Sequence, residues 1–360
     1  MKNTVDTPPT GSGSPPTSVP QGGALAATAP GSSGPSFTSR LHWRSSSIDL
    51  FDFWPLAVML VVIIYTSTQS PYFLTTTNFK NILAINAPLA MMAMGQTFLL
   101  ISAGLDLSIG YNASFAAIVT GLLMQSGHPM WFCIGAGIFA ATAVGFTNGV
   151  LCSLNRAHPF IITLGMSIFL FGVSTELTGG APVNDMKILY SWFGGLLPSG
   201  FPFFGLPAVA LPLFVIVAFA FCFLRWSPIG RRAFAIGGNE EAAYLSGIPV
   251  RTTKIILYTL MGLIVGIAAM CLAGYIDEAS FNLAQNYELQ TIAACVIGGT
   301  ALFGGRGGAF RSLQGVALLA LVNNSVNFVH NIGPITVDAN YQQILLGIII
   351  VIAVMVSRRG

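Results

Sequence analysis

The stretch IILYTLMGLIVGIAAM, Ile255 to Met270, decides what kind of protein this is, because it runs for sixteen residues without a charge. A helix needs about 20 mostly apolar residues to cross the hydrocarbon core of a bilayer, so a transmembrane helix is expected over 253–275. The whole chain of 360 residues has the same character, with 54% hydrophobic and only 8% charged residues. About 25% charged residues is usual in soluble domains. The composition therefore indicates an integral membrane protein.

Nine other apolar runs resemble this one, and each is expected to be a helix because hydrocarbon leaves no partner for unpaired backbone groups. The ten predicted spans are 51–66, 79–102, 107–126, 130–152, 158–178, 206–225, 253–275, 287–304, 312–331 and 341–357. Only SAGLDLSIG, residues 102–110, separates the second from the third. Two helices with a tight break are predicted there, and one long span with a re-entrant piece is the alternative. The predicted fold class is an all-α integral membrane protein with about ten transmembrane helices.

The distribution of Lys and Arg predicts the orientation of these spans. With the N-terminus in the cytoplasm, the cytoplasmic segments hold thirteen basic residues, which are Lys2, Arg40, Arg44, Arg156, Arg225, Arg231, Arg232, Arg251, Lys254, Arg306, Arg311, Arg358 and Arg359. The outer segments hold only Lys80 and Lys187. Acidic residues show the reverse preference, and Glu288 is among those assigned to the outside. Because basic residues accumulate on the cytoplasmic side, both termini are predicted to be cytoplasmic.

Two domains are expected. Residues 1–45 are predicted to form a disordered cytoplasmic tail, because the segment is rich in Pro, Gly, Ser and Thr and has too little apolar surface to bury. Residues 46–360 are predicted to form the transmembrane domain. The five cysteines and four histidines are scattered singly, so no metal site is expected.

The segment GGNEEAAYLSGIPV, residues 237–250, interrupts the apolar pattern and is predicted to be a short cytoplasmic helix. Asn239 suits the N-cap, and Glu240 and Glu241 follow in the first turn, where the helix dipole favours anions. Gly247 suits the C′ position that ends the helix. An apolar stripe is expected from Tyr244, Leu245 and Ile248. A helix of about two turns is not stable alone, so it must rest on lipid headgroups or in a groove of a partner protein.

Three stretches carry a resemblance to a known family. GRRAFAIGGNEEAAYLSGIPV (Gly230–Val250) resembles the cytoplasmic coupling loop of the ribose/xylose/arabinose-type permeases of ABC importers, which form a branched-chain/sugar binding-protein-dependent transport family. GQTFLLISAGLDLSIG (Gly95–Gly110) and IGGTALFGGRGGAF (Ile297–Phe310) match two further stretches of that family. The three occur in family order, and the resemblance covers roughly 50–358.

This resemblance implies a multi-pass permease in the bacterial inner membrane, a homodimer with a heterodimer as the alternative. It implies a cytoplasmic ATPase subunit that docks on the coupling helix and a periplasmic sugar-binding protein that delivers the solute. Besides membrane lipid, no other partner is expected, and nucleic acid is not one. The positions matching the coupling region are Arg231, Arg232, Glu240, Glu241, Ala242 and Gly247.

The chain is not expected to hydrolyse ATP itself. A P-loop requires G-x-x-x-x-G-K-[ST], with a lysine that reaches the phosphates. The Gly-rich stretch 297–310 has no Gly-Lys-Ser/Thr, so a tight cytoplasmic turn is the better interpretation. No cofactor is therefore expected on this chain, and ATP would be bound by the partner subunit.

A few polar residues within the predicted spans are candidates for the substrate pathway. They are Gln96, Asp106, Ser108, Asn323 and Asn327. Asp106 lies at the break between two spans, where it is expected to cap the third span, and binding of substrate hydroxyls is the alternative. Asn323 and Asn327 are four residues apart and share a helix face, which suits either interhelical hydrogen bonds or a weakly polar lining.

The predicted function is that of a permease subunit, not an enzyme, in an ATP-driven importer for a small uncharged sugar of the pentose or hexose class. The alternative is an ion-coupled secondary transporter that uses Asp106 as its proton or sodium site. An intramembrane enzyme is the least favoured hypothesis, because it would need a convergent set of acids, bases or metal ligands, and the sequence has none.

Overall fold

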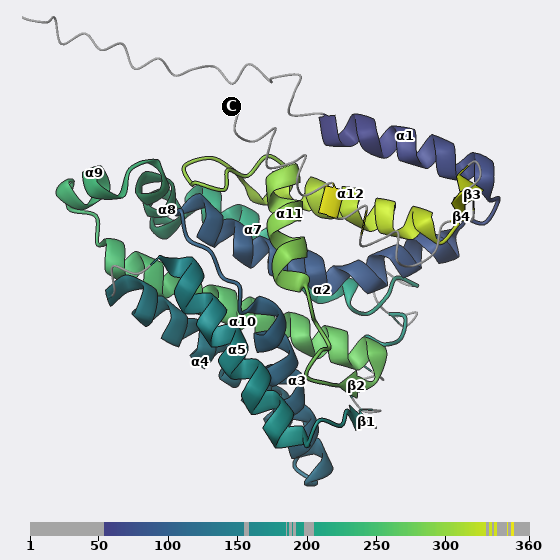
Figure 1. The fold of residues 1–360 in the computed structure, drawn as a ribbon, viewed down its shortest axis with the longest axis horizontal. Helices are drawn as coiled ribbons and strands as arrows, with labels where there is room; N and C mark the ends of the chain where they lie inside the picture. The colour runs from purple at the N-terminus through teal and green to yellow at the C-terminus, as the bar shows by residue number, and fades with distance from the viewer. Residues whose placement is uncertain are drawn as a thin grey trace, which may run out of the picture. The chain divides into compact units, whose positions relative to one another are not determined.

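A computed structural model shows the fold of the chain (Figure 1). It describes residues 54–154, 158–184, 186, 189, 192–197, 205–328, 331–332, 335–336, 344 and 347–348. The predicted tail, residues 1–45, and nearly all of the predicted span 341–357 lie outside the described residues.

The described part is almost entirely helical. Its helices are α1 (Trp54–Gln69), α2 (Thr76–Ile101), α3 (Ile109–Gln125), α4 (Met130–Leu154), α5 (Pro159–Thr178), α7 (Ala210–Trp226), α8 (Pro228–Gly238), α9 (Glu240–Leu245), α10 (Val250–Ile276), α11 (Tyr287–Ile297) and α12 (Ala309–Val326). Four two-residue strands, β1 (Val183–Asn184), β2 (Glu278–Ala279), β3 (Asn331–Ile332) and β4 (Ile335–Thr336), form the antiparallel pairs β1–β2 and β3–β4.

Four described helices, α2, α4, α5 and α10, are long and apolar enough to cross a membrane. A fifth crossing is made if α7 and α8 count as one span, although they are bent by 70° at their junction. The bend follows from sequence, because Ser227 caps α8 by accepting the Gly230 amide at 2.8 Å and Pro228 cannot continue α7. Of the ten predicted spans, the described residues thus support four or five.

The predicted span 287–304 is wrong in its length. Helix α11 stops at Ile297 after 11 residues, which at 1.5 Å per residue is about half of the hydrocarbon thickness. Gly298 and Gly299 end it, with Gly299 at φ +94°. Before α11 the chain folds back into the bundle, where the buried Ala284 donates its amide to Ser114 of α3 at 3.3 Å. Non-helical backbone at membrane depth is tolerated when it is buried in protein in this way.

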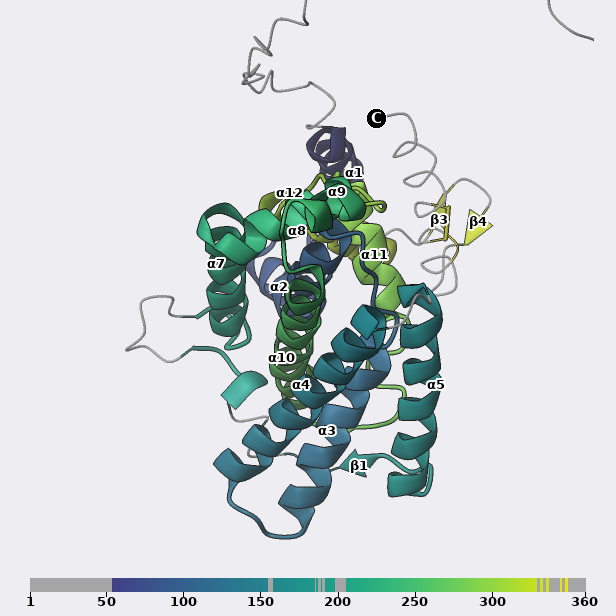
Figure 2. The same cartoon turned by 90° about the vertical axis from the view of Figure 1, so that its left-hand side faces the viewer.

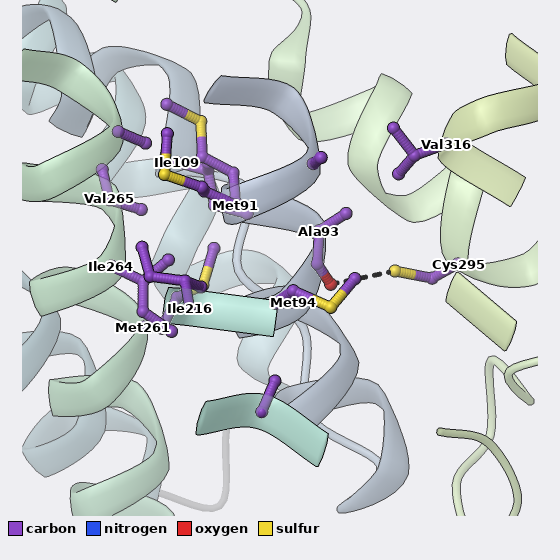
Figure 3. Close-up of a cluster of buried hydrophobic side chains, with 14 of the residues drawn as sticks. Met91, Ala93, Met94, Ile109, Ile216, Met261, Ile264, Val265, Cys295 and Val316 are labelled. Atoms are coloured by element: carbon purple, nitrogen blue, oxygen red, sulfur yellow. Dashed lines mark hydrogen bonds between the residues drawn. The ribbon is translucent and has the colours of Figure 1, made fainter. Parts of the chain in front are cut away.

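Helix α10 is the centre of the packing, in contact with α4, α2 and α3 (Figures 1 and 2). Helix α2 has α10 on one side and α11 and α12 on the other, and it is almost completely buried from Ala87 onward. Figure 3 shows the apolar side chains at this contact. They include Met91, Met94, Met261, Ile264 and Val265. Helix α5 packs against α3 and α4, and its Phe171 ring contacts Phe281 in the segment before α11.

Two pairs of loops that are each assigned to one side of the membrane by sequence contact each other. Two segments assigned to the outside pair with each other through β1 and β2, with Val183 opposite Ala279. Two segments assigned to the cytoplasm are joined by a hydrogen bond from the Gly305 amide to the Ile101 carbonyl, 2.9 Å long. The end of α8 lies against both of these residues. The predicted break between the second and third spans is confirmed as residues 102–108 between α2 and α3.

Candidate functional site

The α2–α3 break starts with a left-handed turn. Ala103 has φ +56°, and its amide bonds to the Leu100 carbonyl at 2.9 Å while the Gly104 amide bonds to the Leu99 carbonyl at 2.8 Å. This pair of bonds is a Schellman closure, in which glycine usually takes the left-handed position. Alanine there is strained. The strain lies directly before the polar residues of the break.

Asp106 is the centre of the polar cluster in the break and is only 2% exposed. Its Oδ1 accepts the Ser108 amide at 2.8 Å and the Ser108 hydroxyl at 2.7 Å. Asn148 of α4 donates Nδ2 to the Ser108 hydroxyl at 2.9 Å and lies 3.4 Å from both carboxylate oxygens. Among the described residues, no Lys or Arg forms an ion pair with Asp106. The carboxylate is therefore held by neutral donors.

The prediction that Asp106 caps α3 is wrong in its position. Ser108 occupies the N-cap of α3 with helical backbone angles and makes no side-chain cap bond. Asp106 lies two residues earlier, where its side chain closes a local turn onto Ser108. The carboxylate thus shapes the backbone before the helix rather than the first turn of the helix itself.

Several buried polar atoms near this break have no hydrogen-bond partner. They are Nε2 and Oε1 of Gln96, Oδ1 of Asn112, Oδ1 of Asn148 and Oε2 of Glu288. Buried polar atoms are nearly always paired, so such a group calls for an explanation. Water or a polar solute in the interior of the bundle would supply the missing partners.

Gln96 of α2 is directed into the space between two other helices. Its neighbour Gly95 lies against Met261 of α10, and Thr97 lies 3.4 Å from Cys295 of α11. Successive residues of a helix are about 100° apart, so Gln96 points between α10 and α11. The side chain therefore faces the space between α10 and α11, the two helices that α3 also contacts.

Glu288 belongs to the same region, which the sequence did not predict. A Cβ on Gly110, in the first turn of α3, would overlap the Glu288 carboxylate and the Ala284 carbonyl. Glu288 thus lies against α3 rather than with the charges of the outer loops. The segment 280–286 brings it there by folding back into the bundle.

Asn323 and Asn327 are not part of this cluster. Asn327 is the C-cap of α12, and Asn324, which follows Asn323, exchanges two 3.0 Å hydrogen bonds with Asn78 in the first turn of α2. Asp106 follows the opposite end of α2, a helix of 26 residues. The predicted pathway residues therefore fall into two groups, with Gln96, Asp106 and Ser108 at the break and the two asparagines far from them.

The second candidate region is α9, whose ends are closed as the sequence predicts. Asn239 accepts the Ala242 amide at 2.9 Å, which confirms it as the N-cap. Gly247 has φ +80°, and its amide bonds to the Tyr244 carbonyl at 2.9 Å. The Ile248 amide bonds back to the third-last helical residue at 3.1 Å and completes a Schellman motif. Glu240 and Glu241 lie in the first turn, as expected.

The predicted apolar stripe of α9 is divided between two faces. Ala243 is buried in a small cluster with Ile236, Val250 and the partly buried Ile248. Tyr244 and Leu245 point away from this cluster and are 70% and 78% exposed. The left-handed Gly247 turns the chain back, so Ile248 covers the inner face instead of extending the outer one. Helix α9 thus rests on α8 and α10 and presents an aromatic and an aliphatic side chain outward.

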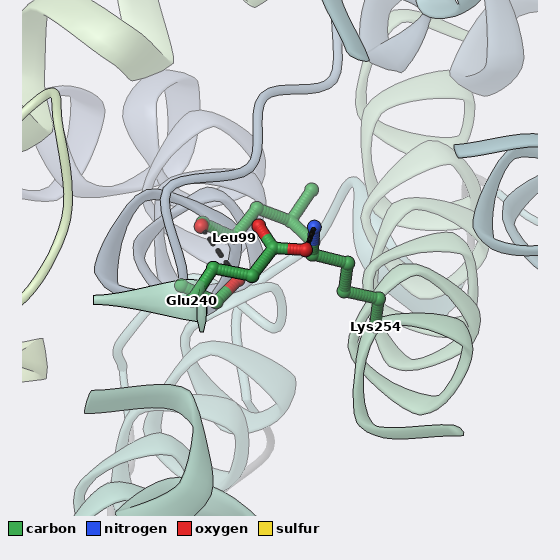
Figure 4. A network of polar contacts seen from close by, with 4 residues as sticks. Leu99, Glu240 and Lys254 are labelled. Carbon is green, nitrogen blue, oxygen red and sulfur yellow. Dashed lines mark hydrogen bonds and ion pairs between the residues drawn. The ribbon is translucent and has the colours of Figure 1, made fainter. Parts of the chain in front are cut away.

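Charged side chains lie in and near the first turn of α9. Glu240 pairs with Lys254 of α10 at 2.7 Å (Figure 4). Arg231 of α8 donates to the Trp226 carbonyl at 3.0 Å, and Glu241 and Ala242 are exposed. A cleft of about 850 Å³ lies beside the helix. Its lining includes Glu240, Glu241, Tyr244, Lys254 and His158. The region can therefore receive a protein surface that carries both apolar and charged groups.

No metal centre is found in the part of the chain that the structure describes, because no three His, Cys, Asp or Glu residues come together there. Two residues of the candidate site, Asn148 and Glu288, are not predicted from the sequence. Asn148 lies on a predicted span like many other polar residues, and only the contact between α3 and α4 brings it to Asp106.

Comparison with known proteins identifies the family. Residues 78–354 match the family described as "Branched-chain amino acid transport system / permease component". The ribose import permease of Escherichia coli K12 is 34% identical over 84% of this chain and 92% of that protein. The galactose/methyl galactoside import permease of Salmonella typhimurium LT2 is 31% identical over 83% of this chain and 90% of its own.

The D-allose transport system permease of Escherichia coli K12 is 28% identical and covers 89% of this chain and 98% of its own. The family match covers more than half of the chain, and the first relative is similar over nearly its full length. The chain therefore belongs to the branched-chain amino acid transport system / permease component family, and it is a multi-pass transport protein of the bacterial inner membrane.

Proposed function

We propose that this chain is the membrane permease of an ATP-driven, binding-protein-dependent importer for a small uncharged sugar of the pentose or hexose class. The observation that carries the proposal is the similarity to permeases named for ribose, galactose and allose over 83% or more of the chain. The chemistry around the α2–α3 break supports it, because unpartnered amide atoms such as those of Gln96 in α2 suit the hydroxyl groups of a neutral sugar.

The family description names amino acids, whereas these relatives are named for sugars. An amino acid carries a carboxylate and an ammonium group, and their recognition in a dry site calls for charged partners. Among the described residues, the buried polar set at the break has no Lys or Arg. The break therefore lacks the basic partner that the carboxylate of an amino acid would need.

In this proposal, ATP is hydrolysed by a separate cytoplasmic ATPase that docks on α8 and α9. The docking residues in this proposal are Arg231, Arg232, Glu240, Glu241, Ala242 and Gly247, together with Tyr244 and Leu245, which the exposure of α9 adds. A periplasmic sugar-binding protein would deliver the solute from the other side. A second permease copy would complete the assembly, with both in contact with membrane lipid.

Uptake of labelled sugars tests the proposal. Cells without ribose, allose and galactose importers would express this chain with a matching ATPase and binding protein. Uptake of at least one sugar is expected, and it should stop when the ATPase carries a substitution that prevents hydrolysis. Uptake that persists with the inactive ATPase and disappears when the membrane gradient is dissipated would favour ion coupling through Asp106 instead. Relatives of this chain are named import permeases, and this does not favour the alternative.

A further inference from the structure

Three backbone segments meet beside the α2–α3 break. They are the last turn of α8 at Gly237, the last residue of α2 at Ile101, and the turn at Gly304 and Gly305 that leads toward α12. The Gly305 amide donates to the Ile101 carbonyl at 2.9 Å. Gly237 lies against both of these groups. We call this three-way contact, made by Ile101, Gly237, Gly304 and Gly305, the glycine junction.

The glycine junction leaves no room for side chains. A Cβ on Gly237 would overlap the Ile101 carbonyl oxygen and the Gly305 amide nitrogen. A Cβ on Gly304, which has φ +93°, would lie 2.8 Å from the Gly237 Cα and 3.0 Å from the Ala103 Cβ. A contact between backbones has no rotamers that could absorb a displacement. Movement of α8 is therefore passed to α2 rather than lost in flexible side chains.

A second attachment holds the glycine turn to α2. The Thr97 hydroxyl of α2 donates to the Ser312 hydroxyl of α12 at 2.7 Å, and Ser312 lies 3.0 Å from the Thr300 hydroxyl. All three side chains are buried. The turn between α11 and α12 is thus tied to α2 before and after Gly305.

The glycine junction lies between the two candidate regions. On one side, Gly238 and Asn239 lead directly into α9. On the other, Ile101 precedes the strained Ala103 and, five residues on, Asp106. A strained turn is a position where two backbone arrangements can lie close in free energy.

We propose that the glycine junction transmits displacement of the docking surface on α8 and α9 to the α2–α3 break, and that Gly237 and Gly304 are positioning residues for transport. The proposal rests on the proposed function, because it assumes that an ATPase pushes on α9. Neither glycine touches solute or nucleotide in this account. They act through the contact between backbones.

The test compares Gly237→Ala with Gly238→Ala, because a Cβ on Gly238 would meet nothing within 4 Å. The complete complex of permease, ATPase and binding protein in vesicles gives two rates, sugar uptake and ATP hydrolysis. For Gly237→Ala, uptake per ATP is expected to fall about tenfold while the ATPase stays bound. For Gly238→Ala, both rates should stay within about twofold of the unsubstituted complex. Equal uptake per ATP in the two variants would overturn the proposal.

A second pair of variants tests the proposal independently, in case Gly237→Ala does not fold. Gly304→Ala is expected to uncouple like Gly237→Ala, whereas Gly308→Ala, whose Cβ would meet nothing within 4 Å, should not. If Gly308→Ala uncoupled transport as strongly as Gly304→Ala, any change in this turn would impair transport. The proposed role of the glycine junction would then be wrong.

Hydrogen exchange gives a readout that does not depend on the sugar. ATPase binding should change the exchange of residues 102–108 in the unsubstituted chain and in Gly238→Ala, but not in Gly237→Ala. If ATPase binding changed the exchange in Gly237→Ala as it does in the unsubstituted chain, the proposed role of the glycine junction would be wrong, while the proposed function would remain intact. Failure of the unsubstituted complex to bind any ATPase or take up any sugar would instead overturn the proposed function.

Discussion

The α2–α3 break and helix α9 leave opposite kinds of atoms without partners. In the helices around the break, buried amide and carboxylate atoms lack hydrogen bonds, including both polar atoms of Gln96 in α2. In α9 both helix ends are capped, but the large apolar side chains of Tyr244 and Leu245 are exposed. A polar solute passing through could satisfy the first region, and only a lasting protein contact would cover the second. These differences match the roles that we propose, with solute passing at the break and an ATPase docking on α9.

The largest expected effect is that of Leu245→Asp. Burial of a leucine in an interface contributes about 1.5–3 kcal/mol, and the new carboxylate adds a desolvation cost, so ATPase affinity should fall about 100-fold. Folding should be unaffected because Leu245 is 78% exposed. Binding of purified ATPase to the permease in detergent measures the effect, with Leu245→Met as the matched control. Undiminished affinity in Leu245→Asp would mean that α9 is not the docking surface.

Asp106→Ala should act on the other region. It leaves the Ser108 amide and hydroxyl without their acceptor, which costs about 1–3 kcal/mol of unfolding free energy. Uptake should fall about tenfold because the break loses its shape, while ATPase binding is retained. Thermal unfolding and uptake of the reconstituted complex measure the two effects. Should ATPase affinity fall as much as uptake, the two regions would not be separable.

The double variant Glu240→Ala/Glu241→Ala removes the charges at the base of α9. Its expected effect on stability is below about 1 kcal/mol, because the Glu240–Lys254 pair is partly exposed on the Glu240 side. Uptake should nevertheless fall about fivefold, because electrostatic complementarity with the ATPase becomes weaker. The protein should remain in the membrane at its normal level. Uptake at the same rate as in the unsubstituted complex would show that the two carboxylates have no role in coupling.

The smallest effect is predicted for Gln96→Met, which should raise the stability of the protein but lower its uptake of sugar. Replacing a buried amide that has no partner by an apolar side chain of similar size should raise the unfolding free energy by about 1 kcal/mol. Uptake should fall, because the solute loses a hydrogen-bonding group. Thr97→Val is the contrasting control, since Thr97 is fully bonded and its loss should lower stability. A Gln96→Met variant that is less stable than the parent would show that the amide has a partner.

Local signals in the sequence predicted much of α9 and the break. Asn239 and Gly247 were correct because capping depends on residues within one turn. The apolar stripe was predicted wrongly, because helical spacing does not continue beyond a left-handed residue and Ile248 therefore folds inward. The tight break after α2 was predicted because Gly and Asp interrupt an apolar run.

Long-range contacts could not be predicted in the same way. Asn148 joins Asp106 through the packing of α3 on α4, and Glu288 reaches Gly110 only because residues 280–286 fold back into the bundle. The length of α11 was overestimated because hydropathy over 287–304 does not register a turn made of glycines. Spacing along the chain carries no information about which of several buried polar residues will meet.

The account depends on the claim that this chain moves solute only when a separate ATPase acts on α9. The most direct measurement places the purified permease in vesicles, alone or with its ATPase, binding protein and ATP, and follows labelled sugar. Accumulation against the concentration gradient is predicted for the complete complex and none for the permease alone. Accumulation by the permease alone, with an ion gradient as its only energy source, would contradict the claim.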